Sequence, residues 1–390
     1  MSTMANLAFR EQNATQEDGL INDQEIDFVQ QLETEGILSQ REKAILRSSQ
    51  ITTAEELYSL MQSFPSLAKY GVDRARLSNI GARESDPSFI QVANRSKSAT
   101  NAKKRSQLGA FYPAQAPARL GFKVPLPTDE AAETFASQSL QHYTQTIKYV
   151  VPDEKWPIRD QGARGTCVAF AMVACREYIE FSRKGDYLPL SEQFLYWGAK
   201  RKDQRPHLSG TFIRYATLAC SDYGICEGKH WPYNKDVLTG NETHEGDQSP
   251  SDQALEDARS RIYTDKRAIK GQDSGNAEKL LLALQSSQHP IPISVPVFKD
   301  EGEESDNWTT DVTLTSGKVL DPPPTSEVVG GHAVCVTGWI PHKSELLGGF
   351  FVFRNSWGKD WATNPPNRPR GYGIISASYI DRYLWEMYIE

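Results

Sequence analysis

The chain has few cysteines, no long hydrophobic run and no excess of positive charge. Five cysteines in 390 residues form a sparse, odd-numbered set, which indicates a reducing compartment and argues against a framework of disulfides. No run of about 18 apolar residues occurs, and the N-terminal segment lacks the apolar core of a secretory signal. These absences argue against a disulfide scaffold, a membrane partner and export, and they predict a cytoplasmic protein.

Charge and composition narrow the class of protein and the number of domains further. The net charge is −7, and acidic and basic residues are interspersed. The basic run KSATNAKKR is typical of a solvated connector, so we expect no nucleic-acid partner. A hydrophobic content of 38% is enough for a sizeable core, and the length fits two domains, one of them large.

Three zones follow one another along the chain. Residues 1–82 contain short helical patterns that begin with capping residues, and they predict a small helical domain. The expected starts are Asn22 or Asp23, Ser39, and Thr52 or Thr53. Residues 83–139 are polar and proline-rich and predict a linker. Residues 140–390 change to one long helix and a mixed region that ends in strands, which predicts the larger domain.

Cys167 stands where a helix is expected to begin, in the stretch GARGTCVAFAMVACREY. Residues 167–183 contain no glycine or proline and carry apolar residues at helical spacing, which predicts a long buried helix with Thr166 as its cap. The first turn of a helix lowers the pKa of a thiol, because its unpaired N–H groups favour negative charge. A nucleophile is one interpretation of Cys167. A buried packing residue is the other, and for an isolated cysteine it is the more frequent one.

Two later stretches supply what a nucleophilic cysteine needs. In VVGGHAVCVTGW, His332 follows two glycines and precedes a strand predicted over residues 333–339; in GGFFVFRNSWGKDW, Asn355 ends a second apolar strand. Antiparallel pairing would bring His332 and Asn355 to related ends of the two strands. A thiol, an imidazole and an amide that orients the ring form a catalytic triad in outline.

These stretches, in this order, resemble the signature blocks of the papain family (C1) of cysteine peptidases. The blocks are DQGARGTCVAFA, GGHAVCVTGW, and FRNSWGKDW followed by RGYG, with a fourth, LSEQFLYW, between the first two. Four ordered blocks are far more specific than any one of them. The resemblance covers roughly residues 140–390 and implies an α+β, papain-like fold with a helical left lobe and a β-rich right lobe, preceded here by the small α-helical domain.

The resemblance implies a cysteine peptidase that hydrolyses peptide bonds through a thioester. Cys167 would be the nucleophile, His332 the base and Asn355 the residue that holds the imidazole. Gln161 would join the Cys167 N–H in an oxyanion hole. Trp357 would shield the hydrogen bond between Asn355 and His332 from water.

The same resemblance indicates where a substrate would lie. Ser209 and Gly210 would bind its backbone, Gly331 would let it come close, and Ala333 suggests an apolar pocket for the second residue before the cut. Peptides or proteins are the expected substrates. No cofactor and no metal is implied.

Some positions depart from the family pattern. Arg164 stands where secreted members have a cysteine, which removes a neighbouring disulfide and fits a disulfide-poor, prokaryotic-type member. Val168 stands where they have a tryptophan, so the wall on the primed side of the site is expected to differ. Cys167 and His332 are 165 residues apart (332 − 167), against about 130–150 in this family. Polar insertions are therefore expected between the two.

Three other interpretations stay open. A catalytically silent papain-fold module would bind or scaffold a partner without chemistry. An acyl-transfer enzyme would keep the chemistry but hand the acyl group to an amine. Cys220, Cys226 and His230 could be ligands of a metal, although their spacing is unusual for zinc and a fourth ligand is not evident.

The N-terminal region is not covered by the resemblance. Residues 20–82 lack the long, regularly spaced helix of the family's inhibitory propeptides, so we expect an interaction module for a protein partner. The proline-rich stretch LGAFYPAQAPARLGFKVPLP would then only tether this module. In the alternative interpretation, the stretch lies in the cleft as part of an inhibitory propeptide.

Overall fold

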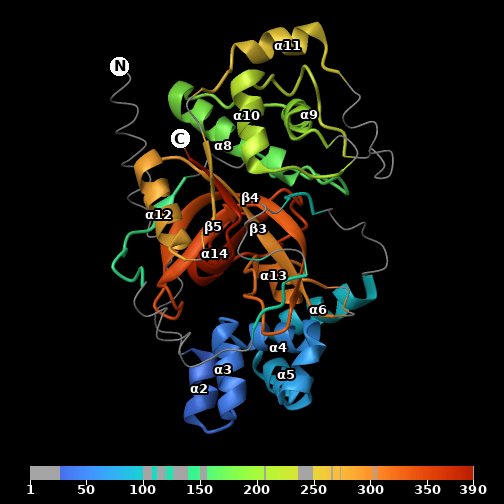
Figure 1. The fold of residues 1–390 in the computed structure, drawn as a ribbon. Coiled ribbons are helices and arrows are strands. Elements are labelled where there is room, and N and C mark those ends of the chain that lie inside the picture. The colour runs from blue at the N-terminus through green and yellow to red at the C-terminus, as the bar shows by residue number, and fades with distance from the viewer. Residues whose placement is uncertain are drawn as a thin grey trace.

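The structure, a computed structural model, has three parts arranged in a row (Figure 1). A helical unit, α2 to α6, lies at one end; a β-rich lobe around β3, β4 and β5 lies in the middle; and a helical lobe around α8 lies at the other end. The described residues are 27–99, 108–111, 118, 121–125, 139–149, 156–205, 208–235, 249–264, 267–272, 274–301, 303 and 305–389.

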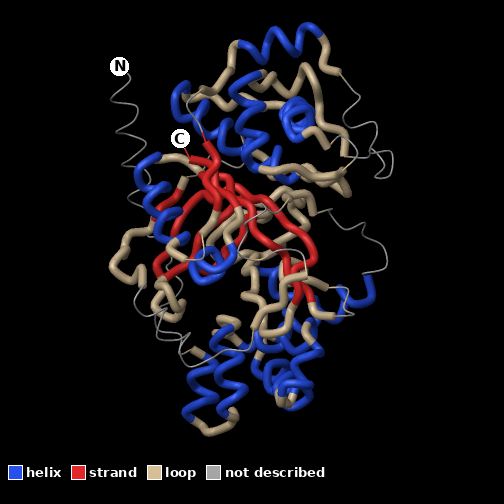
Figure 2. Tube along the Cα trace, in the orientation of Figure 1, coloured by secondary structure: helices blue, strands red, loops and turns tan. Residues whose placement is uncertain are grey.

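Short helices make up the N-terminal unit (Figure 2). They are α2 (Phe28–Thr34), α3 (Gln40–Ser48), α4 (Ala54–Ser63), the 3-10 helix η1 (Pro65–Tyr70), α5 (Arg74–Glu84) and α6 (Pro87–Ala99). Ser39 forms a capping box with Glu42, and the Thr53 hydroxyl accepts a hydrogen bond from the Glu56 N–H, which confirms these two predicted starts. The expected start at Asn22 or Asp23 lies outside the described residues.

The helices continue past residue 82, where the sequence predicts a linker. For residues 87–99 that prediction is wrong, because they form α6. The Asp86 carboxylate accepts from the Ser88 N–H at 2.7 Å, and Pro87 takes the first helical position, where its missing N–H costs nothing. Phe89 and Ala93, one turn apart, are buried in the core of the unit, so an apolar face lies within a polar stretch.

The helical unit packs directly on the β-rich lobe. Helices α4 and α6 contact α13 (Asp311–Ser316), and Val312 and Leu320 of the lobe belong to the same core cluster as the unit's own residues. The ammonium of Lys318 donates to Glu56 Oε1 at 2.7 Å with both side chains buried. The unit is therefore held by a shared core and a buried ion pair.

Helix α8 (Cys167–Lys184) is the centre of the helical lobe. Every residue from Cys167 to Phe181 is buried, because α9 (Glu192–Asp203) and α10 (Ile213–Asp222) pack on one side and strands β3 and β4 on the other. This confirms the long buried helix expected from the sequence. Helix α11 (Asp252–Arg259) packs on α9 in a smaller cluster.

An antiparallel sheet forms the β-rich lobe. Its order is β2 (Arg267–Lys270), β7 (Glu386–Ile389), β3 (Ile291–Lys299), β4 (Glu327–Pro341), β5 (Gly349–Arg354) and β6 (Tyr372–Ser376), with β1 (Ile147–Lys148) paired to β4. The helices α12 (Asn276–Ser287) and α14 (Ala377–Tyr383) contact each other and the sheet. Trp339 of β4 lies opposite Phe351 of β5, so the predicted antiparallel pair is confirmed. His332 therefore lies in β4, and Asn355 directly follows β5.

The ion pair between the helical unit and the lobe gives a stability prediction. Glu56→Ala leaves the Lys318 ammonium buried without its carboxylate, and we expect a loss of about 3 kcal/mol in the free energy of unfolding. Glu33→Ala is the matched control, because its partner Arg47 is 65% exposed and the expected loss is below about 1 kcal/mol. Urea denaturation measures both. Equal losses in the two variants would contradict a structural role for the buried pair.

Candidate active site

Cys167 is the first residue of α8, at the junction of the two lobes. Thr166 occupies the N-cap position, as predicted, but its hydroxyl bonds to the Tyr233 hydroxyl at 2.7 Å and makes no cap bond. The N–H groups of Cys167 and Val168 instead favour the thiolate of Cys167 itself. The start of the helix thus presents its donors to the sulfur and not to a capping side chain.

In the β-rich lobe, across from Cys167, His332 is held by Asn355. The imidazole Nε2 donates to Asn355 Oδ1 at 2.8 Å, and the same oxygen accepts the Ser356 N–H at 2.8 Å. Nδ1 of His332 is buried and has no hydrogen-bond partner among the described residues. Since Cys167 packs against Ala333, the next residue along β4, this nitrogen is the one available to the thiol.

Two tryptophans enclose the imidazole. The Trp357 ring lies over His332 with centroids 4.4 Å apart, and the Trp308 ring meets it edge-on at 5.1 Å. The position of Trp357 agrees with the expected shielding role. Trp308 was not found from the sequence, because it lies in a polar stretch expected to be an insertion and no spacing rule connects it to His332.

Gln161 joins the loop before α8 to the loop after β5. Its backbone N–H donates to the Ser356 carbonyl at 2.8 Å, and its Oε1 accepts from the Ser356 hydroxyl at 2.7 Å. The amide nitrogen faces the other way and donates to the Arg164 carbonyl at 2.7 Å. Its donor end is therefore directed to the loop that leads to Cys167, where it bonds to the backbone.

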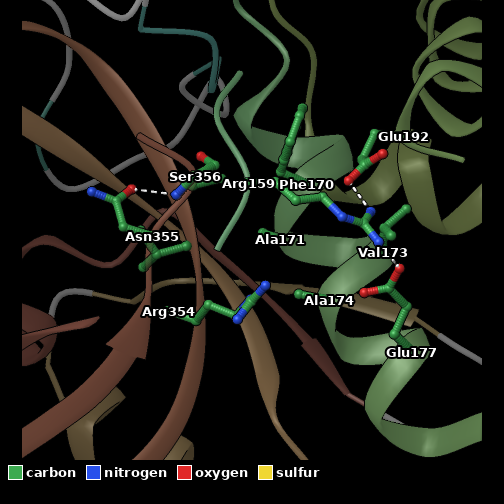
Figure 3. A pocket seen from close by; sticks show the side chains of 12 residues that line it. Arg159, Phe170, Ala171, Val173, Ala174, Glu177, Glu192, Arg354, Asn355 and Ser356 are labelled. Carbon is green, nitrogen blue, oxygen red and sulfur yellow. Dashed lines mark hydrogen bonds and ion pairs between the residues drawn. The ribbon is translucent and has the colours of Figure 1, made fainter. Parts of the chain in front are cut away.

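Charged side chains line the interface between the lobes beside Asn355 (Figure 3). Arg159 forms ion pairs with Glu177 of α8 and Glu192 of α9, and Arg354 donates to the carbonyl of Trp156 at 3.0 Å. They line a small cavity together with Asn355 and Ser356. Burial raises the pKa of Glu192, and Arg159 opposes this. The sequence signal for this cluster was the charged residue Glu177, which follows a run of apolar positions in α8.

The chain's own residues 108–111 occupy the cleft between the lobes. The Ala110 N–H donates to the Gly331 carbonyl at 3.1 Å on the β-rich side. On the helical side, the Thr211 N–H donates to the Gly109 carbonyl at 2.8 Å, and the Phe111 N–H donates to the Thr211 carbonyl at 2.9 Å. These bonds form a parallel bridge between Ala110 and Thr211. The segment therefore uses backbone groups on both walls of the cleft.

Close backbone contacts require glycine at positions 109 and 331. A Cβ atom on Gly109 would stand 2.1 Å from the Gly165 carbonyl oxygen, and one on Gly331 would stand 2.4 Å from the Ala110 oxygen. Only glycines permit this approach. The prediction that residues 83–139 form a linker is therefore wrong at residues 108–111 as well, because they are bound in the cleft.

The residues expected to contact a substrate, through its backbone or in an apolar pocket, all lie at this cleft. Gly331 accepts from the bound segment, and Ala333 is buried against Cys167. The Ser209 hydroxyl accepts from the Gly165 N–H at 3.1 Å, and the Gly210 N–H donates to the Tyr196 hydroxyl at 3.1 Å. On the helical side, the backbone that pairs with the segment belongs to Thr211, one residue after Gly210. The sequence motifs did not indicate Thr211.

Burial shifts both reacting groups toward their neutral forms. It raises the pKa of the Cys167 thiol to about 11, although N–H groups of Ala333 and Gly109 partly offset this. It lowers the pKa of His332 to about 4, against the hydrogen bond to Asn355, which raises it. With residues 108–111 in place, the pair is therefore thiol and neutral imidazole at pH 7.

The cysteines and histidine considered as metal ligands do not form one site. Cys220 packs with α8, whereas Cys226 packs with the cluster under α11. His230 lies 4.0 Å from the Asp257 carboxylate, which is already paired with Arg261. Each of these cysteines is buried and free, and burial raises the pKa of Cys220 to about 11.

Comparisons with known proteins point to one family. The model of the papain family cysteine proteases matches residues 152–368. An uncharacterized peptidase C1-like protein of Acanthamoeba polyphaga mimivirus is 26% identical over 231 residues, which are 57% of this chain and 64% of that protein. Cathepsin J of Rattus norvegicus is 27% identical over 232 residues, 58% of this chain and 61% of that protein. Xylellain, a cysteine protease from Xylella fastidiosa, superposes with a TM-score of 0.51 at 19% identity, over 74% of this chain and 97% of the other.

The chain belongs to the papain family of cysteine proteases, since the family model covers more than half of it. The fold similarity to xylellain agrees with the two lobes described above, so the α+β, papain-like fold expected from the sequence is confirmed. The alignments span less than two thirds of the length of the two curated relatives. None of the described helices is long and apolar enough to cross a bilayer.

The pKa shifts predict how Cys167 reacts. With a thiol pKa of about 11, less than about 1% is thiolate below pH 9, and the thiolate is the form that reacts. Absorbance at about 240 nm, taken as the difference between the full chain and Cys167→Ala, reports this thiolate without any reagent having to enter the filled cleft. The difference should stay near zero below about pH 9 and rise above about pH 10. A thiolate signal already present between about pH 6 and pH 9 would indicate an ion pair formed in the closed cleft.

Proposed function

We propose that this chain is a cysteine peptidase that hydrolyses peptide bonds through a thioester on Cys167. One observation carries the proposal: His332 Nε2 is fixed by Asn355, while its buried Nδ1 has no partner among the described residues. A buried imidazole nitrogen without a partner is costly. The arrangement makes sense if the partner is the thiol at the start of α8, on the other wall of the same cleft.

Each residue then has one task. His332 Nδ1 takes the proton of the Cys167 thiol, and the sulfur attacks the carbonyl carbon of the substrate. The oxyanion that forms accepts hydrogen bonds from the Cys167 N–H and the Gln161 amide. The C–N bond breaks as His332 protonates the leaving amine. His332 then deprotonates a water molecule, whose oxygen attacks the thioester carbonyl. The C–S bond breaks, the acid is released, and His332 returns the proton to the Cys167 sulfur.

We further propose that residues 108–111 close the cleft and that the active form has moved them out. The support is their position: Gly109 and Ala110 take the hydrogen bonds of Thr211 and Gly331 that a substrate backbone would need. The contact of the Gly109 N–H with the Cys167 sulfur places an N–H, and not a carbonyl carbon, at the nucleophile. A segment in this position blocks the site and is not itself positioned for attack.

A single added methyl group tests the closed cleft. Gly109→Ala cannot keep the present contact with Gly165, so the segment should leave, and iodoacetamide should label Cys167 at least about tenfold faster at pH 7. The control is Gly228→Ala, where the added Cβ meets nothing closer than 3.5 Å. Equal labelling rates for Gly109→Ala and the unmodified chain would show that residues 108–111 do not close the site.

The chemistry is tested in the Gly109→Ala background with a mixed peptide library and mass spectrometry. Cys167→Ala and His332→Ala should abolish cleavage. Asn355→Ala and Gln161→Ala should each reduce it by about 10²- to 10³-fold, since orientation and one oxyanion donor are only parts of the mechanism. An added amine separates hydrolysis from acyl transfer by its products. Labelling of Cys167 without any cleavage would favour a binding module over a peptidase.

A further inference from the structure

A buried ion pair on α9 lies directly under the cleft loop, residues 208–211. Lys200 and Asp203 have side chains that are only 1% and 0% exposed, and their charged atoms are 2.9 Å apart. An exposed pair would cost little, but a buried one loses the hydration of both charges and adds little to stability unless further hydrogen bonds compensate. The compensating bonds therefore indicate what the pair does.

Lys200 directs its ammonium to the backbone of the cleft loop. Besides Asp203, it donates to the Leu208 carbonyl at 2.7 Å and to the Gly210 carbonyl at 2.9 Å. These three acceptors match the three N–H donors of an ammonium. Gly210 has a φ of +98°, a conformation with little intrinsic preference, so the loop relies on such bonds to hold its shape.

Asp203 holds the other end of the same loop. Its Oδ2 accepts from the Thr211 hydroxyl at 2.8 Å, and its Oδ1 accepts from the Arg205 N–H at 2.8 Å. Thr211 is the residue whose N–H and carbonyl both bond to residues 109–111. The ion pair thus fixes the backbone that leads into Thr211 and the side chain of Thr211 itself, on the helical wall of the cleft.

We propose that Lys200 and Asp203 are positioning residues that hold Thr211 for backbone pairing with an extended peptide. This inference deepens the proposed function and rests on it for the identity of the ligand as a peptide. In this proposal, Lys200 and Asp203 determine the binding of an extended main chain and do not affect the reactivity of the Cys167 thiol. The occupant of the groove is recognised through its backbone amides, whatever its side chains are.

The test compares two thiol reagents on Lys200→Met, a change that keeps the volume and removes the charge. A peptidyl epoxide must pair with Thr211, whereas iodoacetamide needs only the thiol. Both must displace residues 108–111 first, so this step cancels in the ratio of their rates of Cys167 labelling. The ratio should fall at least about tenfold in Lys200→Met. It should stay unchanged in the control Lys202→Met, whose partner Asp222 lies on the surface.

Failure of the positioning role and failure of the peptidase activity give different results in this experiment. Neither reagent requires hydrolysis, so the ratio is informative even if the chain cleaves no peptide. A ratio within twofold of the unmodified chain, in a variant that unfolds cooperatively on heating, would overturn the positioning role. If Lys200→Met does not fold, the double variant Lys200→Met/Asp203→Leu, which leaves no unpaired buried charge, is judged by the same criterion.

Discussion

The packing of α8 against β4 is the contact on which the site depends. It brings Cys167, at the start of the helix, against Ala333, the residue after His332. Apolar side chains form most of this contact, and the ion pairs of Arg159 add a polar constraint beside it. Because Cys167 comes from one lobe and His332 from the other, any sliding of α8 along the sheet would separate them. The fold therefore determines the distance between these two side chains.

Burial has two opposing effects at this site. It protects the hydrogen bond between His332 and Asn355 under two tryptophan rings, and it orients the imidazole. It also raises the pKa of Cys167 and lowers that of His332, so the neutral pair is favoured while the cleft is filled. Hydration of the cleft would reverse both shifts, since desolvation is the largest cause of each. Access to the cleft and reactivity of Cys167 are therefore coupled, because both depend on whether water reaches Cys167 and His332.

Glycines explain how the chain can occupy its own cleft. Gly109 passes against the backbone of Gly165, and Gly331 lies under the carbonyl of Ala110, at separations that no side chain would permit. The bound segment then takes hydrogen bonds from both walls. The helical unit, which precedes this segment in the chain, packs on the same β-rich lobe through Lys318 and a shared core.

The sequence by itself determined the family and the two-lobed fold, and it singled out Cys167, His332 and Asn355 as the candidate triad, because four short blocks stand in a fixed order and the helix and strands around them follow local periodicity. Local capping residues likewise predicted the starts at Ser39 and Thr53. Only the tertiary structure decided the rest. The linker prediction failed at residues 87–99, where an apolar face lies in a polar stretch, and at 108–111, whose partners are about 100 and 220 residues away (211 − 110 and 331 − 110). The roles of Trp308, Thr211 and Lys200 were equally invisible, since each depends on a neighbour that is distant in sequence or on a loop shape that no local pattern encodes.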